Sequence, residues 1–279
     1  MQKSERCILC TASGFRIIHR KDEWKYLLCL NCGLVCLHPK PTTETLTKNY
    51  EDYLSVQPEE IGNWESMVKP VVTRSADLIE SRSRTVRGKL LDIGCGYGFF
   101  LQEMKSRGWQ VNGIEISQTG RKYAKNRWDI EVFSEPLETL RFPENSFDVV
   151  TLFYVIEHVL EPLDLMKEVN RILKPKGLVI LRWPHSTPIV RLLGPLSRKL
   201  DLYHTPYHLY DFSPKTIGRL LNRTGFRCIE TLIAGHTRPS SRPSRWSSIA
   251  FGHLGELLYA LSSGNVLLPG ISKMTLAFK

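Results

Sequence analysis

From Lys89 onward, short apolar segments that read as strands alternate with amphipathic segments that read as helices. This alternation predicts an α/β fold, because neighbouring parallel strands are joined by helices that cover both faces of the sheet. The predicted strands are residues 90–93, 110–114, 130–133, 149–153 and 178–182, and the predicted helices are residues 99–107, 118–126 and 163–173. Right-handed crossovers would then give a doubly wound sheet with its ligand site at the carboxyl ends of the strands.

The first predicted strand runs into a glycine-rich loop, DIGCGYG at residues 92–98, which precedes the apolar start of a helix. Glycines here permit positive φ and let a ligand approach the backbone. Their order is G-x-G-x-G, unlike the G-x-G-x-x-G of dinucleotide folds. Glu115 ends the second predicted strand, where a carboxylate can accept both hydroxyls of a ribose. Together the loop and Glu115 predict a site for a ribose-containing cofactor.

Four of the seven cysteines form two pairs near the N-terminus, Cys7-x-x-Cys10 and Cys29-x-x-Cys32. Two intervening residues let both sulfurs of a pair reach one ion, so this spacing is typical of a zinc site. Residues 15–19 and 24–28 between the pairs read as short strands, and the unit resembles a zinc ribbon. Four thiolates leave no open coordination position, so the predicted zinc is structural. The alternative is four buried cysteines with no shared role.

Several segments resemble motifs of the class I S-adenosylmethionine-dependent methyltransferases. Residues 91–98, 113–117 and 146–158 are similar to the family's first, second and strand-four motifs, and residues 171–177 to the end of the helix before strand five. FSP at 212–214 and TGF at 224–226 resemble the elements that lead into strand six. The resemblance covers residue 89 to about residue 233, and a four-cysteine ribbon precedes the domain in a subset of these enzymes. It implies a Rossmann-like, mostly parallel seven-stranded sheet and an enzyme that uses S-adenosyl-L-methionine.

The chain then divides into three predicted parts. Residues 1–40 form the zinc ribbon, residues 41–88 a helical linker or lid, and residues 89–279 the S-adenosylmethionine-binding methyltransferase domain. An insertion at 234–272 separates the last two strands, the second of which is predicted at 274–278. Within the insertion, residues 236–245 read as a flexible basic loop and residues 249–261 as an amphipathic helix that covers the core or contacts a membrane surface.

The resemblance also implies roles for individual residues. Gly94, Cys95 and Gly96 would line the methionine portion of the cofactor, and Asp92 would orient the loop or meet the amino group. Glu115 would bind the ribose and Ile116 would pack on the adenine, whose edge is assigned to the backbone near Leu137. The predicted cofactor-binding set is Asp92, Gly94, Cys95, Gly96, Glu115, Ile116, Leu137 and Phe153.

Methyl transfer is an in-line displacement, so the enzyme mainly aligns the acceptor with the methyl group. A general base matters when the acceptor is an alcohol, whose proton must leave. The candidates are His208, His158 and Tyr154, and we favour His208 because related enzymes carry a substrate-facing histidine there. Glu157 lies four residues before Glu161, and a shared helical face beside His158 would permit metal chemistry. The alternative is a carboxylate that favours the helix dipole and a histidine that only packs.

The final third of the chain is basic, with twelve basic and four acidic side chains between residues 184 and 279. Such a surface suits an anionic partner such as a phosphate, a nucleotide sugar, RNA or an acidic lipid, or serves solubility alone. The longest uncharged stretch, residues 257–272, is too short and polar to span a membrane. The N-terminus lacks the apolar core of a signal peptide, so we expect a cytoplasmic protein.

These observations predict methylation of an oxygen in a small, possibly anionic acceptor such as a sugar or glycan precursor. The ribbon and the positive charge suggest an RNA methyltransferase as one alternative. The Glu157-His158 pair, which is similar to that of some quinone-biosynthesis enzymes, suggests a quinone-precursor O-methyltransferase as another. A cofactor-binding module without turnover is the non-enzymatic alternative.

Overall fold

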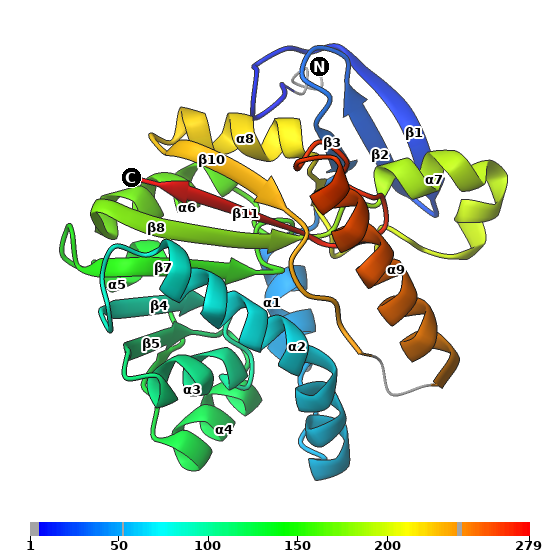
Figure 1. Ribbon diagram of the computed structural model, residues 1–279. Helices are drawn as coiled ribbons and strands as arrows, with labels where there is room; N and C mark the ends of the chain where they lie inside the picture. The colour runs from blue at the N-terminus through cyan, green and yellow to red at the C-terminus, as the bar shows by residue number, and fades with distance from the viewer. Residues whose placement is uncertain (1–5, 52, 239–241) are drawn as a thin grey trace.

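The computed structural model describes residues 6–51, 53–238 and 242–279, and its centre is a seven-stranded sheet (Figure 1). The strand order is β10-β11-β8-β7-β4-β5-β6, and among these strands β11 is antiparallel to its neighbours. The strands are β4 (Lys89–Ile93), β5 (Gln110–Ile114), β6 (Val132–Phe133), β7 (Phe147–Phe153), β8 (Leu173–Trp183), β10 (Arg227–Leu232) and β11 (Lys273–Phe278). The predicted doubly wound, mostly parallel sheet of seven strands is therefore confirmed.

Helices cover both faces of this sheet. The helices α2 (Pro58–Arg82), α3 (Phe99–Ser106) and α4 (Gln118–Trp128) pack on one face, and α5 (Leu137–Leu140), α6 (Pro162–Ile172) and α8 (Pro214–Arg223) pack on the other. Successive side chains of a strand enter the two cores in turn, with Val149 on the α3 side and Val150 on the α6 side. Because both faces are buried, the strands read in the sequence as continuous apolar runs.

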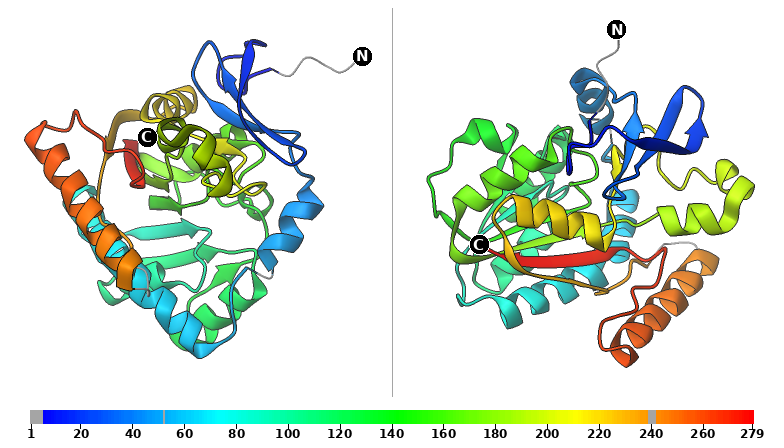
Figure 2. Two further views of the ribbon diagram at one scale, coloured as in Figure 1. Left: turned by 90° about the vertical axis from the view of Figure 1, so that its right-hand side faces the viewer. Right: turned by 90° about the horizontal axis from the view of Figure 1, so that it is seen from above.

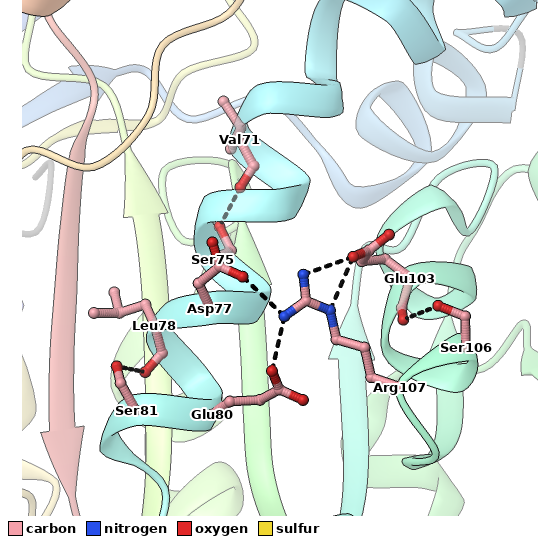
Figure 3. A network of polar contacts seen from close by, with 9 residues as sticks. All are labelled: Val71, Ser75, Asp77, Leu78, Glu80, Ser81, Glu103, Ser106 and Arg107. Carbon is pink, nitrogen blue, oxygen red and sulfur yellow. Dashed lines mark hydrogen bonds and ion pairs between the residues drawn. The ribbon is translucent and has the colours of Figure 1, made fainter.

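The helices α2 and α3 are joined at the surface by one arginine. The guanidinium of Arg107 forms ion pairs with Asp77 at 2.9 Å and Glu80 at 2.8 Å on α2, and with Glu103 at 2.7 Å on α3 (Figure 3). The side chain of Arg107 is 21% exposed, so these pairs are only partly screened by solvent. They hold α2 beside the helix that follows the glycine-rich loop.

The N-terminal segment forms a second, four-stranded sheet in the order β1-β2-β3-β9. Its strands are β1 (Phe15–Lys21), β2 (Trp24–Cys29), β3 (Val35–His38) and β9 (Tyr210–Asp211). The last strand comes from the chain after β8, which the sequence analysis did not predict. The rings of Tyr26 on β2 and Tyr203 also stack, with centroids 4.1 Å apart. The ribbon is thus built onto the loop that contains the predicted catalytic histidine, His208.

The remaining helices lie around the carboxyl ends of the parallel strands. They are α1 (Thr43–Glu51), α7 (Thr187–Leu193), a 3-10 helix (Gly194–Lys199) and α9 (Arg242–Leu261). Figures 1 and 2 show that α9 lies at the periphery, apart from the ribbon sheet. Among the described residues, no helix is both long enough and apolar enough to cross a bilayer.

Three details of the predicted elements are wrong. Residues 156–158 form a turn and α6 begins only at Pro162, so Glu157 and Glu161 do not share a helical face. The strand β8 already begins at Leu173, because Leu173 pairs with Phe147 of β7 ahead of an irregularity in the register. The predicted basic loop at 236–245 is cut short by α9, which starts at Arg242, and residues 239–241 lie outside the described residues.

Candidate functional site

The glycine-rich loop turns back onto the end of β5. The backbone N–H groups of Gly94 and Cys95 donate to the carbonyl of Ile114 at 2.7 and 3.1 Å. Gly94 has a φ of 73°, and a Cβ there would collide with Cγ2 of Val155. Gly96 has a φ of 54°, and a Cβ there would meet no atom within 4 Å. The loop is therefore closely packed against the end of β7 at Gly94 and open above Gly96.

Glu115 fixes the shape of this loop. Its carboxylate accepts a hydrogen bond from the N–H of Gly96 at 2.7 Å and another from the N–H of Ser117 at 2.8 Å. The side chain is nevertheless at the surface of the site, with the residue 9% exposed. Each carboxylate oxygen can accept more than one hydrogen bond, so both can still receive ribose hydroxyls. The neighbouring Ile116 is 38% exposed and offers an apolar surface beside them.

Asp92 lies beneath the loop at the end of β4. It is 2% exposed, and its Oδ1 accepts a hydrogen bond from the Thr151 hydroxyl at 2.6 Å. Burial raises the pKa of Asp92 to about 7, the Thr151 hydrogen bond opposes this, and the nearby Glu115 carboxylate adds to it. A positively charged ligand above the loop would favour the ionised form.

The other predicted cofactor residues contribute in more limited ways. The Sγ of Cys95 points beneath the loop, where a Cβ on Gly113 would come within 2.7 Å of it. Leu137 is 2% exposed, so only its backbone can face a ligand. The ring of Phe153 packs edge-on against Phe100, with centroids 4.9 Å apart. These residues therefore shape the walls of the site.

The segment at residues 41–88, expected to be a helical linker or lid, contacts the glycine-rich loop. Leu54 and Ile61 pack with Tyr97 of the loop, whose hydroxyl donates to the carbonyl of Ser55 at 2.8 Å. Next to them Trp64 packs edge-on against Tyr97. Their position beside the glycine-rich loop depends on tertiary structure that local periodicity does not report.

Two of the three predicted catalytic residues lie together. The rings of His158 and His208 meet edge to face, with centroids 4.8 Å apart, and His204 lies beyond His208 at 5.0 Å. The Nδ1 of His158 is 2.9 Å from the carbonyl of Tyr207. Because a carbonyl only accepts, a hydrogen bond to it requires the proton on Nδ1, which leaves the lone pair on Nε2. The hydroxyl of Tyr50 lies 2.7 Å from the same Nδ1.

The buried carboxyl group of Glu157 lies next to His158. It is 1% exposed, and neither carboxyl oxygen has a partner among the described residues. Its Oε1 is 3.9 Å from Nε2 of His158. Burial raises the pKa of Glu157 to about 8, and the carboxylate of Asp211 adds to the effect. Glu161, in contrast, is exposed and lies 4.0 Å from the Lys40 ammonium.

Burial has the opposite effect on the two histidines. It lowers the pKa of His158 to about 4, although the Tyr207 carbonyl raises it. It lowers the pKa of His208 to about 2, and the neighbouring His158 and His204 rings lower it further. Both rings are therefore neutral at pH 7. The His208 side chain has no hydrogen bond within the described part of the chain, so its acceptor nitrogen is available.

The third predicted catalytic residue points elsewhere. The hydroxyl of Tyr154 donates to Oγ of Ser272 at 2.9 Å and accepts from Nε of Arg182 at 2.9 Å. Arg182 is 1% exposed and also donates to the carbonyls of Ala234 and Gly235, at 2.6 and 2.9 Å. An arginine inside an apolar strand is a sequence signal for such buried partners, and the sequence analysis did not use it.

The four cysteines of the ribbon converge on one point. The sulfurs of Cys7 and Cys32 are 3.4 Å apart, those of Cys10 and Cys29 are 3.5 Å apart, and all four lie within 4.8 Å of one another. A tetrahedral zinc with four Zn–S bonds requires sulfurs about 3.8 Å apart. The donor set and its spacing therefore fit zinc.

The ribbon also contacts the histidine cluster. The hydroxyl of Tyr26 on β2 donates to the carbonyl of His208 at 3.2 Å and lies 3.3 Å from the Thr205 hydroxyl. The backbone carbonyl of Glu157 accepts from the N–H groups of Leu209 and Tyr210, at 2.8 and 3.2 Å. The ribbon and the turn after β7 thus hold the His208 segment from two sides.

Comparison with known proteins identifies the family. Residues 69–231 match the sequence profile of a family described as a methyltransferase domain. A ubiquinone biosynthesis O-methyltransferase of Pseudomonas entomophila is 30% identical over 141 residues, which span 48% of this chain and 60% of that protein. The match thus spans less than two thirds of this relative's length.

Solved structures share the fold at low sequence identity. One is phosphoethanolamine N-methyltransferase 2 of Haemonchus contortus, in complex with phosphomonomethylethanolamine and S-adenosylhomocysteine. It has a TM-score of 0.59 and 19% identity, covering 84% of this chain and 60% of that one. A second, an S-adenosylmethionine-dependent methyltransferase of Archaeoglobus fulgidus, has a TM-score of 0.55 and 18% identity, covering 80% of this chain and 100% of that one.

Proposed function

We propose that this chain, which belongs to the S-adenosylmethionine-dependent methyltransferases, methylates a hydroxyl oxygen of a small metabolite. One observation carries the proposal. A half-buried, neutral histidine, His208, packs against His158 in the turn that follows β7. A hydroxyl acceptor is the kind that needs such a base, because its proton must leave when the oxygen–carbon bond forms.

The residues around the loop fit S-adenosyl-L-methionine. The open space above Gly96 leaves room for the ligand against the backbone, and Glu115 faces it with oxygens that can accept ribose hydroxyls. Ile116 provides the apolar surface for the adenine, and Asp92 supplies negative charge near the methionine end. The cofactor supplies a methyl group on a positively charged sulfur.

His208 is the proposed base and His158 its positioning residue. The acceptor oxygen forms a bond to the methyl carbon while the carbon–sulfur bond breaks, and the hydroxyl proton passes to the imidazole of His208. The Tyr207 carbonyl holds the His158 ring in one tautomer, edge to face with His208. Val155 packs against Gly94 and precedes His158 by only three residues, which supports a position of the cluster near the methionine end of the cofactor site.

Aromatic acceptors fit this site better than sugars. The proposed acceptor site includes the rings of Tyr50, His158 and His208. Aromatic rings pack well against a planar acceptor, either edge to face or in offset stacks. The relatives named for ubiquinone biosynthesis point the same way. A quinone precursor or similar phenol therefore replaces the sugar or glycan precursor as the preferred acceptor.

We further propose that Cys7, Cys10, Cys29 and Cys32 hold a structural zinc ion. Four thiolates also agree with the reducing cytoplasm, in which we place the protein. Through Tyr26 the zinc-bound ribbon would keep the His208 segment in place. This gives the ribbon a role in acceptor binding and requires no contact with nucleic acid.

Methyl transfer from labelled S-adenosylmethionine tests the proposal. The protein would be incubated separately with catechol-type phenols, with free sugars and nucleotide sugars, and with total RNA. We expect O-methylated phenol as the main product, identified by mass spectrometry. Label only in RNA, or only on nitrogen, would contradict the proposed function, and label in the sugars would overturn the preference for phenols.

A further inference from the structure

A second group of metal-ligand side chains lies in the insertion, away from the ribbon and the proposed acceptor site. His236 follows β10, and His253 and Glu256 lie three residues apart on one face of α9. One ligand atom from each comes within 4.8 Å of the other two. The rings of the two histidines are edge to face, with centroids 4.9 Å apart.

His236 is a buried polar side chain of the insertion whose ring nitrogens lack hydrogen-bond partners among the described residues. The residue is 8% exposed. A buried imidazole without hydrogen-bond partners destabilises the folded chain. Gly252 makes its position possible, because a Cβ there would lie 2.5 Å from Nδ1 of His236. The ring is therefore pressed against α9 on the side that presents His253 and Glu256.

Glu256 retains one oxygen for a ligand. Its Oε1 accepts from the N–H of Gly235 at 3.2 Å, which orients the carboxylate toward the chain that contains His236. Its Oε2 is 3.7 Å from Nδ1 of His253. The His253 side chain is 64% exposed and can rotate toward a ligand at little energetic cost. This arrangement has one orienting hydrogen bond and one free oxygen, as in many metal-binding carboxylates.

We propose that His236, His253 and Glu256 bind a divalent transition-metal ion, with Zn²⁺ the best match. Two imidazoles and a carboxylate form an established zinc donor set, and the exposed side at His253 leaves the fourth position to water. Ligand atoms around a tetrahedral zinc lie about 3.4 Å apart. The three ligand atoms already lie within 4.8 Å of one another, so a small movement of the side chains would bring them to this distance. A bound ion would fasten α9 to the end of β10.

Positive charges near the three side chains should limit their affinity for a metal ion. The guanidinium of Arg182 bonds to the carbonyls of Ala234 and Gly235, and Arg238 lies on the same segment, so two cations oppose one carboxylate. We therefore expect weaker binding than at the four thiolates of the ribbon. A chelator of intermediate strength should remove this ion first and leave the ribbon zinc in place.

The test uses the full chain with the ribbon zinc loaded. Equilibrium dialysis against Zn²⁺, with the metal measured by mass spectrometry, should give two ions per wild-type chain. His253→Asn should bind one, and Glu256→Gln, which keeps an acceptor for Gly235, should bind the second ion at least tenfold more weakly. Glu230→Gln, which removes an exposed carboxylate paired with Arg82, is the matched control and should still bind two.

Replacement by Co²⁺ separates the sites by spectrum. The ribbon should give intense thiolate charge-transfer bands in every variant, while only the wild type and Glu230→Gln should add the weak bands of a nitrogen and oxygen site. One ion per wild-type chain would overturn the proposal. So would a second ion that persists in His253→Asn, or one that is lost in Glu157→Gln, because it would then belong to the cluster at Glu157, His158 and His208.

Discussion

The cofactor side of the site is built from the ends of adjacent parallel strands, whereas the acceptor side is built from segments far apart in the sequence. Asp92 and Glu115 end β4 and β5, which pair directly. The histidine cluster instead combines Tyr50 of α1, the turn after β7 and the loop at 204–208. Local backbone geometry determines the first arrangement. The second depends on tertiary contacts, among them those with the zinc ribbon.

The two sides also differ in how burial acts on charge. On the cofactor side, Asp92 and Glu115 have hydrogen-bond donors, and a positively charged ligand would favour their ionised forms. On the acceptor side, burial keeps Glu157 protonated and His158 and His208 neutral at pH 7. The first side is suited to bind a cation, and the second keeps its imidazoles unprotonated at neutral pH.

Removal of the ribbon zinc should have the largest effect. Cys29→Ser should release the ion, because a structural zinc site contributes about 10 to 16 kcal/mol of apparent binding energy. Metal analysis and thermal unfolding would measure this, and Cys228→Ser, which changes an exposed free cysteine, is the control. If acceptor turnover falls while cofactor affinity holds, the ribbon supports only the acceptor side. Full retention of zinc in Cys29→Ser would exclude the four-cysteine site.

Loss of the proposed base should have the next largest effect. His208→Ala should lower kcat by about 10² to 10⁴, because the hydroxyl proton loses its acceptor, and should leave cofactor affinity near that of the wild type. His185→Ala is the matched control, since burial also lowers the pKa of His185, to about 4. Equal losses in both variants would mean that the effect on kcat is structural.

Loss of Glu115 should weaken cofactor binding and leave the acceptor side of the site intact. Glu115→Ala should weaken S-adenosylmethionine binding at least about tenfold, because charge-assisted hydrogen bonds contribute about 1.5 to 3 kcal/mol each. Calorimetry with S-adenosylhomocysteine would measure the change, with Glu138→Ala, an exposed carboxylate on α5, as the control. Unchanged affinity in a folded Glu115→Ala protein would remove Glu115 from the cofactor site.

The buried carboxyl of Glu157 should make stability depend on pH. Its folded pKa of about 8 lies above the ordinary value of 4.5, so its contribution to stability is lost as the pH rises from 4.5 to 8. His158, whose pKa is lowered, acts in the opposite direction only below its ordinary value of 6.5. Between pH 6.5 and 8, unfolding free energy of the wild type should therefore fall by up to about 1.4 kcal/mol per pH unit relative to Glu157→Gln. Parallel curves from urea unfolding would contradict a buried, protonated Glu157.

The same contrast explains what the sequence could predict. The strand ends, the glycine-rich loop and the two cysteine pairs are local patterns, and the structure places them as expected. The position of Tyr50 beside His158, the pairing of β9 with β3 and the exposed site of Glu161 were not predicted. They arise when segments more than a hundred residues apart pack together. Helical periodicity had placed Glu157 and Glu161 on one face, but Pro162 begins the helix only after both.

The pH dependence of a single methyl transfer tests the central claim most directly. The rate would be measured with cofactor and acceptor prebound, from pH 5 to pH 8, in the wild type and in His208→Ala. A histidine is a base only when unprotonated, and burial lowers the pKa of both His158 and His208 to about 4 or less. The wild type should therefore stay faster than His208→Ala across the whole range, with no acidic limb above pH 5. Equal rates in the two proteins, or an advantage that disappears below pH 6.5, would contradict the account.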